Sequence, residues 1–159
     1  MSIRNLESLF QPRSVAVIGA SDRPGSVGAV VLRNLLQGGF AGPVWPVNRR
    51  HARVGGLAAW RDVDALPGVP ELAVICTPAP SVPGLVADLG RRGTRAAVVL
   101  SAGLKQPMHE GGPTLEQAML DAARPHLLRV LGPNCIGLLA PGVGLNASFA
   151  PSNAQAGPI

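Results

Sequence analysis

Apolar runs of strand length alternate with helical patterns along the chain. Continuous apolar runs predict strands at residues 14–18, 44–47, 72–76, 96–100 and 129–131. Apolar residues at helical spacing predict helices at residues 27–36, 82–89 and 114–123, and an amphipathic helix at residues 3–10. We expect Thr114 to cap the helix that begins there, with Gln117 as its capping-box partner. Weaker patterns predict a small strand or turn at residues 55–60 and a short helix at residues 62–66.

The order of these elements predicts the fold class. The apolar runs are continuous rather than alternating, which indicates strands that are buried on both faces. Helices separate the strands, which indicates parallel neighbours joined by crossovers. We therefore expect an α/β fold with a Rossmann-like, doubly wound, mostly parallel sheet and helices on both faces. The length of 159 residues fits one such domain.

Composition narrows the choice of partners. Aromatic residues make up 3% of the chain, which disfavours the stacking platforms that bind nucleic acids, so no nucleic-acid partner is expected. The formal net charge of +5 raises the question of another anionic partner. Cys76 and Cys135 lack CxxC or Cys/His spacing and predict neither a disulfide framework nor a metal site. No signal peptide or bilayer-spanning run is visible, so we expect a cytoplasmic protein without a membrane partner.

Small or polar residues directly follow each predicted strand. These strand-end segments lie at residues 19–22, 48–50, 77–79, 101–103 and 132–135. Ligands of doubly wound sheets bind beyond the carboxyl ends of the strands, where all five segments should meet. Small side chains and free backbone N–H groups in such a crevice suit a long, thin ligand that carries phosphate.

The first strand-end segment predicts a phosphate site. Gly19 permits a tight turn, and Gly25, Ser26 and Gly28 place bare backbone at the start of the next helix, whose N-terminus favours a pyrophosphate. The spacing differs from the standard dinucleotide fingerprint, because the second glycine comes six positions after the first, rather than two. The alternative is a glycine turn that serves packing alone.

The second strand-end segment discriminates between cofactors. An NAD-binding domain would carry Asp or Glu here, whereas this chain has Asn48, Arg49 and Arg50. Guanidinium groups bind phosphate, so an adenosine with an extra phosphate, as in NADP or coenzyme A, is favoured over an exposed Arg pair. No His, Tyr or Lys lies on the five segments to donate a proton in hydride transfer, which disfavours NADP.

Several short motifs resemble those of one family. They lie at residues 14–21, 24–28, 46–48, 101–103, 132–135 and 145–149. In this order and spacing the chain resembles the N-terminal CoA-binding domain of NDP-forming acyl-CoA synthetases, which include ADP-forming acetate–CoA ligase and resemble the succinyl-CoA synthetase alpha subunit. Some members are fused to a GNAT acetyltransferase. The chain departs from the family at Gln106, where Glu is usual, and at Arg49, where Pro is usual.

The resemblance implies coenzyme A, or an acyl-CoA thioester, as the ligand. Its phosphates would lie near Ser21 and Gly25, its adenosine near Asn48, and its pantetheine near Ser101, with Cys135 close to the reaction centre. The complete set of predicted cofactor-binding residues is Gly19, Ala20, Ser21, Gly25, Ser26, Val27, Gly28, Val47, Asn48, Arg49, Thr77, Pro78, Ser101, Ala102, Gly103, Asn134 and Cys135. No catalytic residue is expected in the chain.

The resemblance also implies a domain organisation. Residues 1–13 would be a helical lead-in, residues 14–150 the CoA-binding domain, and residues 151–159 the start of a linker to a second domain. We therefore expect a non-catalytic domain whose partners are the phosphohistidine and ATP-grasp parts of an acyl-CoA ligase, or of a ligase-like protein acetyltransferase. The alternatives are a standalone CoA-binding regulatory protein and an NADP-binding oxidoreductase domain.

Overall fold

The centre of the molecule is a parallel sheet. The computed structural model describes residues 3–155 and 157. Five strands form the sheet in the order β2-β1-β5-β6-β7. Their bounds are β1 Val15–Ile18, β2 Val44–Val47, β5 Leu72–Ile75, β6 Ala96–Val99 and β7 Arg129–Leu131. The strand order changes direction between β1 and β5, since the chain runs outward to β2 before it crosses to β5, and this switch point is where such sheets bind ligands.

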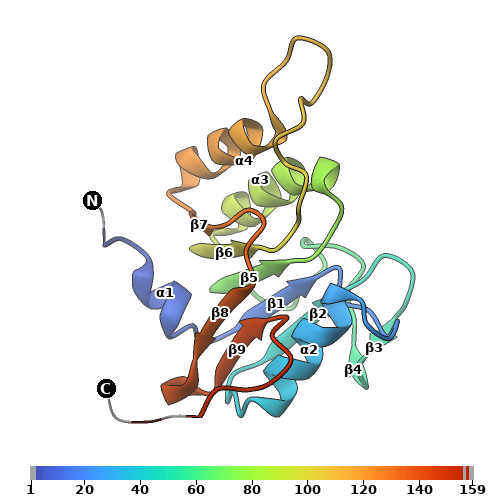
Figure 1. Cartoon of the computed structure of the whole chain (residues 1–159), viewed down its shortest axis with the longest axis vertical. Helices are drawn as coiled ribbons and strands as arrows, with labels where there is room; N and C mark the ends of the chain where they lie inside the picture. Colours follow the sequence, from blue (N-terminus) through green and yellow to red (C-terminus); the bar gives the residue numbers. More distant parts are fainter. Residues whose placement is uncertain (1–2, 156, 158–159) are drawn as a thin grey trace.

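Layers of different composition cover the two faces of the sheet (Figure 1). Helices α3 (Val82–Arg92) and α4 (Leu115–Ala123) pack on one face. Helix α2 (Val27–Gln37), helix α1 (Leu6–Phe10) and the antiparallel strands β8 (Gly137–Ala140) and β9 (Leu145–Ser148) pack on the other. The predicted α/β fold is confirmed, although a hairpin that the apolar pattern did not predict completes the second face.

Side chains of the buried strands point alternately to the two faces of the sheet, and so contribute to both halves of the core. In β1, Ala16 and Ile18 face α3 and α4, whereas Val15 and Val17 face α2 and the hairpin. All four residues of β1 are buried, as the continuous apolar run predicts. The sheet is therefore packed on both sides, and the loops of the site follow its strand ends.

The predicted cap of α4 forms in part, and a glycine ends α3. The hydroxyl oxygen of Thr114 accepts a hydrogen bond from the backbone N–H of Gln117 at 3.1 Å, which confirms the predicted cap of α4. The Gln117 side chain does not complete a capping box, because its amide donates to Asp121 at 3.0 Å. Helix α3 ends at Gly93, whose φ of 97° terminates the helix in the left-handed region.

The crossover from β2 to β5 contains no helix. It consists of the short strands β3 (Arg53–Val54) and β4 (Leu57–Ala58) and then an irregular segment, residues 61–71, so the helix predicted at residues 62–66 is wrong. The guanidinium of Arg92, on α3, donates to the backbone oxygens of Asp64, Leu66 and Gly68 at 2.8, 3.1 and 3.1 Å. These carbonyls bond to Arg92 instead of forming a helical ladder.

The remaining elements are short. Single 3₁₀ turns lie at Ala79–Ser81, Arg124–His126 and Pro141–Val143. The N-terminal helix covers only Leu6–Phe10, rather than residues 3–10, because Asn5 at φ 60° interrupts the helical backbone. Within the described residues, no helix has the length and apolar character that a bilayer crossing requires.

Candidate functional site

A cavity of about 410 Å³ opens at the switch point between β1 and β5. Eight of the residues predicted to bind the cofactor line it, and all eight follow or end strands β1, β2 and β5: Gly19, Ala20, Ser21, Val47, Asn48, Arg49, Thr77 and Pro78. Ile18 and Leu85 add apolar wall. The structure therefore brings together the first three strand-end segments as the sheet topology predicts.

The last two strand-end segments lie at a second cavity. It measures about 530 Å³, and its lining includes the predicted residues Gly103 and Asn134 together with Lys105 and Glu116. Ser101 joins the segments that carry the two cavities, because its hydroxyl donates to the Thr77 carbonyl at 2.5 Å and its carbonyl accepts from the Asn134 N–H at 3.1 Å. An extended ligand that spans both cavities would pass this pair of bonds.

The other predicted residues line neither cavity. These are Gly25, Ser26, Val27, Gly28, Ser101, Ala102 and Cys135. The hydroxyl of Ser26 is occupied by capping, since it donates to the Arg23 carbonyl at 2.8 Å and accepts from the Ala29 N–H at 3.4 Å. Gly25, by contrast, is exposed at φ 75° with no atom within 4 Å of where a Cβ would lie, so this part of the turn is open to a ligand.

Gly28 has a packing role, which the sequence analysis gave as the alternative for this glycine turn. A Cβ on this residue would lie 2.0 Å from the carbonyl oxygen of Gly19. Helix α2 therefore approaches the end of β1 more closely than any side chain allows. The residue is buried, and it allows the close contact between helix and strand.

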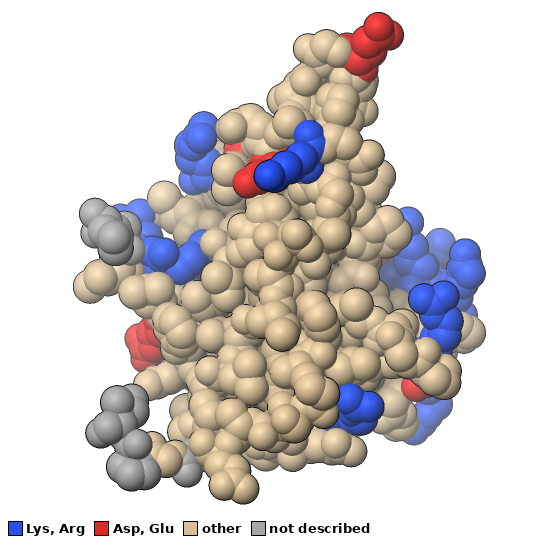
Figure 2. Space-filling model, viewed as in Figure 1, with Lys and Arg blue, Asp and Glu red and all other residues tan. Residues whose placement is uncertain are grey.

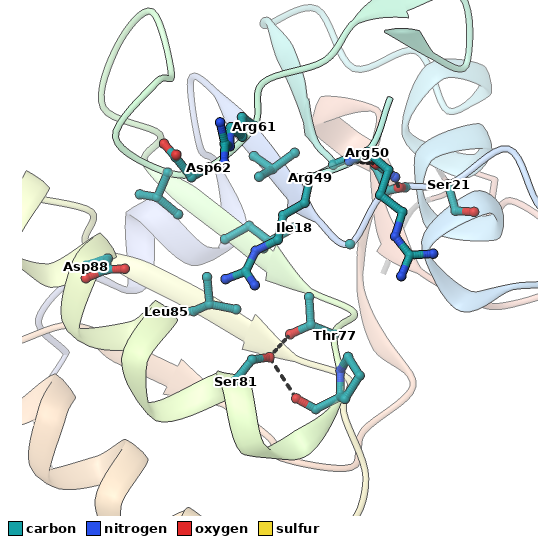
Figure 3. A pocket seen from close by; sticks show the side chains of 16 residues that line it. Ile18, Ser21, Arg49, Arg50, Arg61, Asp62, Thr77, Ser81, Leu85 and Asp88 are labelled. Atoms are coloured by element: carbon teal, nitrogen blue, oxygen red, sulfur yellow. Dashed lines mark hydrogen bonds between the residues drawn. The ribbon is translucent and has the colours of Figure 1, made fainter. Parts of the chain in front are cut away.

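Three arginines line the first cavity, Arg49, Arg50 and Arg61, and the Arg49 side chain points into it (Figure 3). Its guanidinium extends toward Leu85 and Ser81, whereas the Arg50 side chain runs in a different direction, toward the side where Ser21 lies. Within the described part of the chain, neither arginine has a carboxylate within 4 Å. Figure 2 shows Lys and Arg side chains gathered at the edge of the molecule where β3 and β4 lie. An anionic group in the cavity would therefore meet a guanidinium that is not ion-paired, in a lining that also holds the carboxylates of Asp62 and Asp88.

Asn48 is held by the protein itself. Its side-chain N–H donates to the Ala20 carbonyl at 2.8 Å, and its side-chain oxygen accepts from the N–H groups of Arg50 and His51 at 2.8 and 2.9 Å. The carboxamide thus connects the ends of β1 and β2 across the mouth of the cavity.

The two cysteines differ in environment. Burial raises the pKa of the Cys76 thiol to about 12, so this side chain stays protonated near neutral pH. The Cys135 Sγ lies 3.5 Å from the Val99 carbonyl oxygen, and the side chain packs against the core.

Several lining residues were missed by the sequence analysis. Arg61, Asp62 and Val63 come from the irregular crossover, and no local pattern marks them as part of the cavity. Ser81, Leu85 and Asp88 come from α3 and its preceding turn. Their spacing of four and three residues places them on one helical face, and this signal could have been found because the helix directly follows the third strand-end segment.

Comparisons with known proteins agree on one family. A family profile described as a CoA binding domain matches residues 13–141. The alpha subunit of ADP-forming acetate–CoA ligase I from Pyrococcus furiosus is 35% identical over an alignment of 159 positions that covers 98% of this chain and 34% of that protein. ADP-forming acetate–CoA ligase I from Archaeoglobus fulgidus is 37% identical over 145 residues, 91% of this chain and 21% of that protein.

A solved structure gives the same likeness in three dimensions. The dinucleotide-forming acetyl-coenzyme A synthetase 1 of Ca. Korarchaeum cryptofilum, in complex with phosphate and ADP, superposes with a TM-score of 0.85 at 40% identity. The match covers 96% of this chain and 32% of that chain. The chain thus spans about a third or less of the length of these relatives.

Proposed function

Since this chain belongs to the CoA-binding domain family, we propose that its strand-end crevice binds coenzyme A or an acyl-CoA thioester at the predicted site residues. The observation that carries the proposal is the first cavity, where Arg49 points between apolar walls at the switch point of the sheet. A guanidinium there suits the 3′-phosphate of coenzyme A, and the apolar surface of Ile18 and Leu85 suits the adenine.

The remaining parts of the crevice fit the rest of the ligand. The open turn at Gly25 and the start of α2 offer backbone N–H groups to the pyrophosphate. The pantetheine then passes Thr77 and Ser101 toward the second cavity at Asn134. Coenzyme A supplies the thiol that carries an acyl group, and the residues of this chain hold and orient it.

We further propose that the chain serves a larger NDP-forming acyl-CoA ligase. Such an enzyme converts acyl-CoA, NDP and phosphate to the free acid, CoA and NTP, and a ligase-like protein acetyltransferase is the alternative. The relatives support the ligase, since two are named as ADP-forming acetate–CoA ligases and a third, 37% identical over 158 residues, as a trans-feruloyl-CoA synthase. Residues 14–150 would bind coenzyme A, residues 1–13 would lead into this domain, and residues 151–159 would connect it to the catalytic parts.

NADP is the competing ligand, because it also carries an adenosine with an extra phosphate. The described residues that line the first cavity include no His, Tyr or Lys that could donate a proton beside a nicotinamide. This composition supports coenzyme A over a hydride-transfer cofactor.

Calorimetric titration of the purified chain tests the proposal. We expect coenzyme A to bind more tightly than 3′-dephospho-CoA, and NADP to bind least. Equal affinities for coenzyme A and dephospho-CoA would remove the role given to Arg49. Tighter binding of NADP than of coenzyme A would overturn the proposed function.

A further inference from the structure

We propose that Asn48 is a positioning residue, which orients Arg49 toward the 3′-phosphate and so sets the preference for coenzyme A over dephospho-CoA; this inference rests on the proposed function. Asn48 lines the cavity mouth, but its carboxamide is engaged by the protein backbone. The side-chain oxygen accepts hydrogen bonds from two backbone N–H groups, and the side-chain NH₂ donates one to the Ala20 carbonyl. The side chain therefore acts through the loop that it holds.

Hydrogen bonds hold the backbone on both sides of Arg49. On one side, the N–H of Asn48 donates to the Trp60 carbonyl at 2.8 Å. On the other, the N–H groups of Arg50 and His51 donate to the Asn48 side chain, which forms an Asx turn. A turn directs successive side chains differently, and Figure 3 shows this divergence, with Arg49 inside the cavity and Arg50 directed elsewhere.

The bond to Ala20 adds a second constraint. Ala20 belongs to the strand-end segment that follows β1, and Asn48 to the one that follows β2. Their 2.8 Å hydrogen bond therefore links these two segments. A donor and an acceptor on one short side chain are both needed for this arrangement. Aspartate lacks the donor, serine does not have the reach for both contacts, and alanine has neither group.

Arg49 is exposed apart from this support, so the orientation of its guanidinium depends on the loop beneath it. Once the loop is released, the guanidinium is free to leave the cavity, and the contact with a 3′-phosphate is lost. Dephospho-CoA has no phosphate at that position. Loss of the Asn48 side chain should therefore lower the affinity for coenzyme A more than the affinity for dephospho-CoA. General damage to the fold would lower both affinities together.

A double-mutant cycle measured by calorimetry on the full 159-residue chain tests this inference. We expect Asn48→Ala and Arg49→Ala each to lower the affinity for coenzyme A by about tenfold, the size of one charge-assisted contact. Each should lower the affinity for dephospho-CoA by less than about twofold, and the double variant should lose no more than either single variant.

Asn48→Ser is the second variant, because its hydroxyl can still accept from the Arg50 N–H in an analogous turn. It should retain part of the selectivity, and it replaces Asn48→Ala in the cycle if circular dichroism shows the alanine variant unfolded. Equal losses for the two ligands, or additive losses in the double variant, would overturn the positioning role while leaving coenzyme A binding intact. Wild-type chain that binds no coenzyme A would overturn the proposed function, and this inference with it.

Discussion

Replacement of Gly28 by alanine tests the close contact between helix α2 and the end of strand β1, where the first strand-end segment begins. The new Cβ would lie 2.0 Å from the Gly19 oxygen and 2.9 Å from its carbonyl carbon, distances that no real methyl group tolerates. The Gly19 backbone cannot easily move away. Its φ is 87°, and the place that a Cβ would take on Gly19 is only 3.1 Å from the Cys76 carbonyl. Helix α2 must therefore shift away from β1.

The cost of this shift can be estimated. Overpacking of this kind costs about 3 kcal/mol, at the upper end of the usual range, because rigid backbone rather than a side chain must move. The better helix propensity of alanine returns about 1 kcal/mol. The net loss of about 2 kcal/mol corresponds to a melting temperature lower by roughly 4–8 °C for a chain of this size.

Thermal unfolding followed by circular dichroism measures the difference, and Gly84→Ala is the matched control. Gly84 also lies in the first turn of a helix, but it is exposed, and no atom lies within 4 Å of the place that a Cβ would take. Its replacement should raise the stability by about 0.5–1 kcal/mol. A Gly28→Ala chain that melts at or above the wild-type temperature would refute the close approach of α2 to β1.

Three further predictions concern the loops and the core. Arg49→Gln should lower the affinity for coenzyme A by about tenfold at low salt and less at high salt, and Arg50→Gln should have a smaller effect, as calorimetry at two ionic strengths would show. Arg92→Ala should destabilise the chain by about 2 kcal/mol in urea unfolding, because it removes three hydrogen bonds to the crossover. The control Arg91→Ala removes only an exposed ion pair and should cost less than about 0.5 kcal/mol. Because burial raises the pKa of Cys76 from 9.0 to about 12, its contribution to stability should be complete below pH 9.0 and fall as the pH rises above it. The slope should be at most about 1.4 kcal/mol per pH unit, and urea unfolding should show that Cys76→Ala removes it.

The sheet could be predicted because its strands carry their own signal. Residues 96–100, for example, are continuously apolar, and β6 is buried on both faces. Strand order carries no such local signal, since it depends on where each crossover packs. The β8–β9 hairpin was missed because the residues of β8, Gly137–Ala140, do not alternate. In β9, apolar Leu145 and Ala147 alternate with polar Asn146 and Ser148, but the strand has only four residues and all of them are buried.

The site could be predicted only as far as topology determines it. Parallel strands bring their carboxyl ends to one edge, so the strand-end segments were identified, but their separation into two cavities depends on loop conformation. The hydrogen bonds of the Asn48 and Arg92 side chains could not be predicted for a related reason. Their partners are backbone groups, some of them 28 residues away along the chain. Every residue has a backbone carbonyl, so the sequence does not indicate which one a side chain will bind.

A crystal structure of the chain with coenzyme A bound would test the central claim most directly. We predict the adenosine in the first cavity, with the 3′-phosphate within hydrogen-bond distance of Arg49, and the pantetheine running past Ser101 toward Asn134. Coenzyme A bound away from the strand-end crevice, with Arg49 making no contact to phosphate, would contradict the claim.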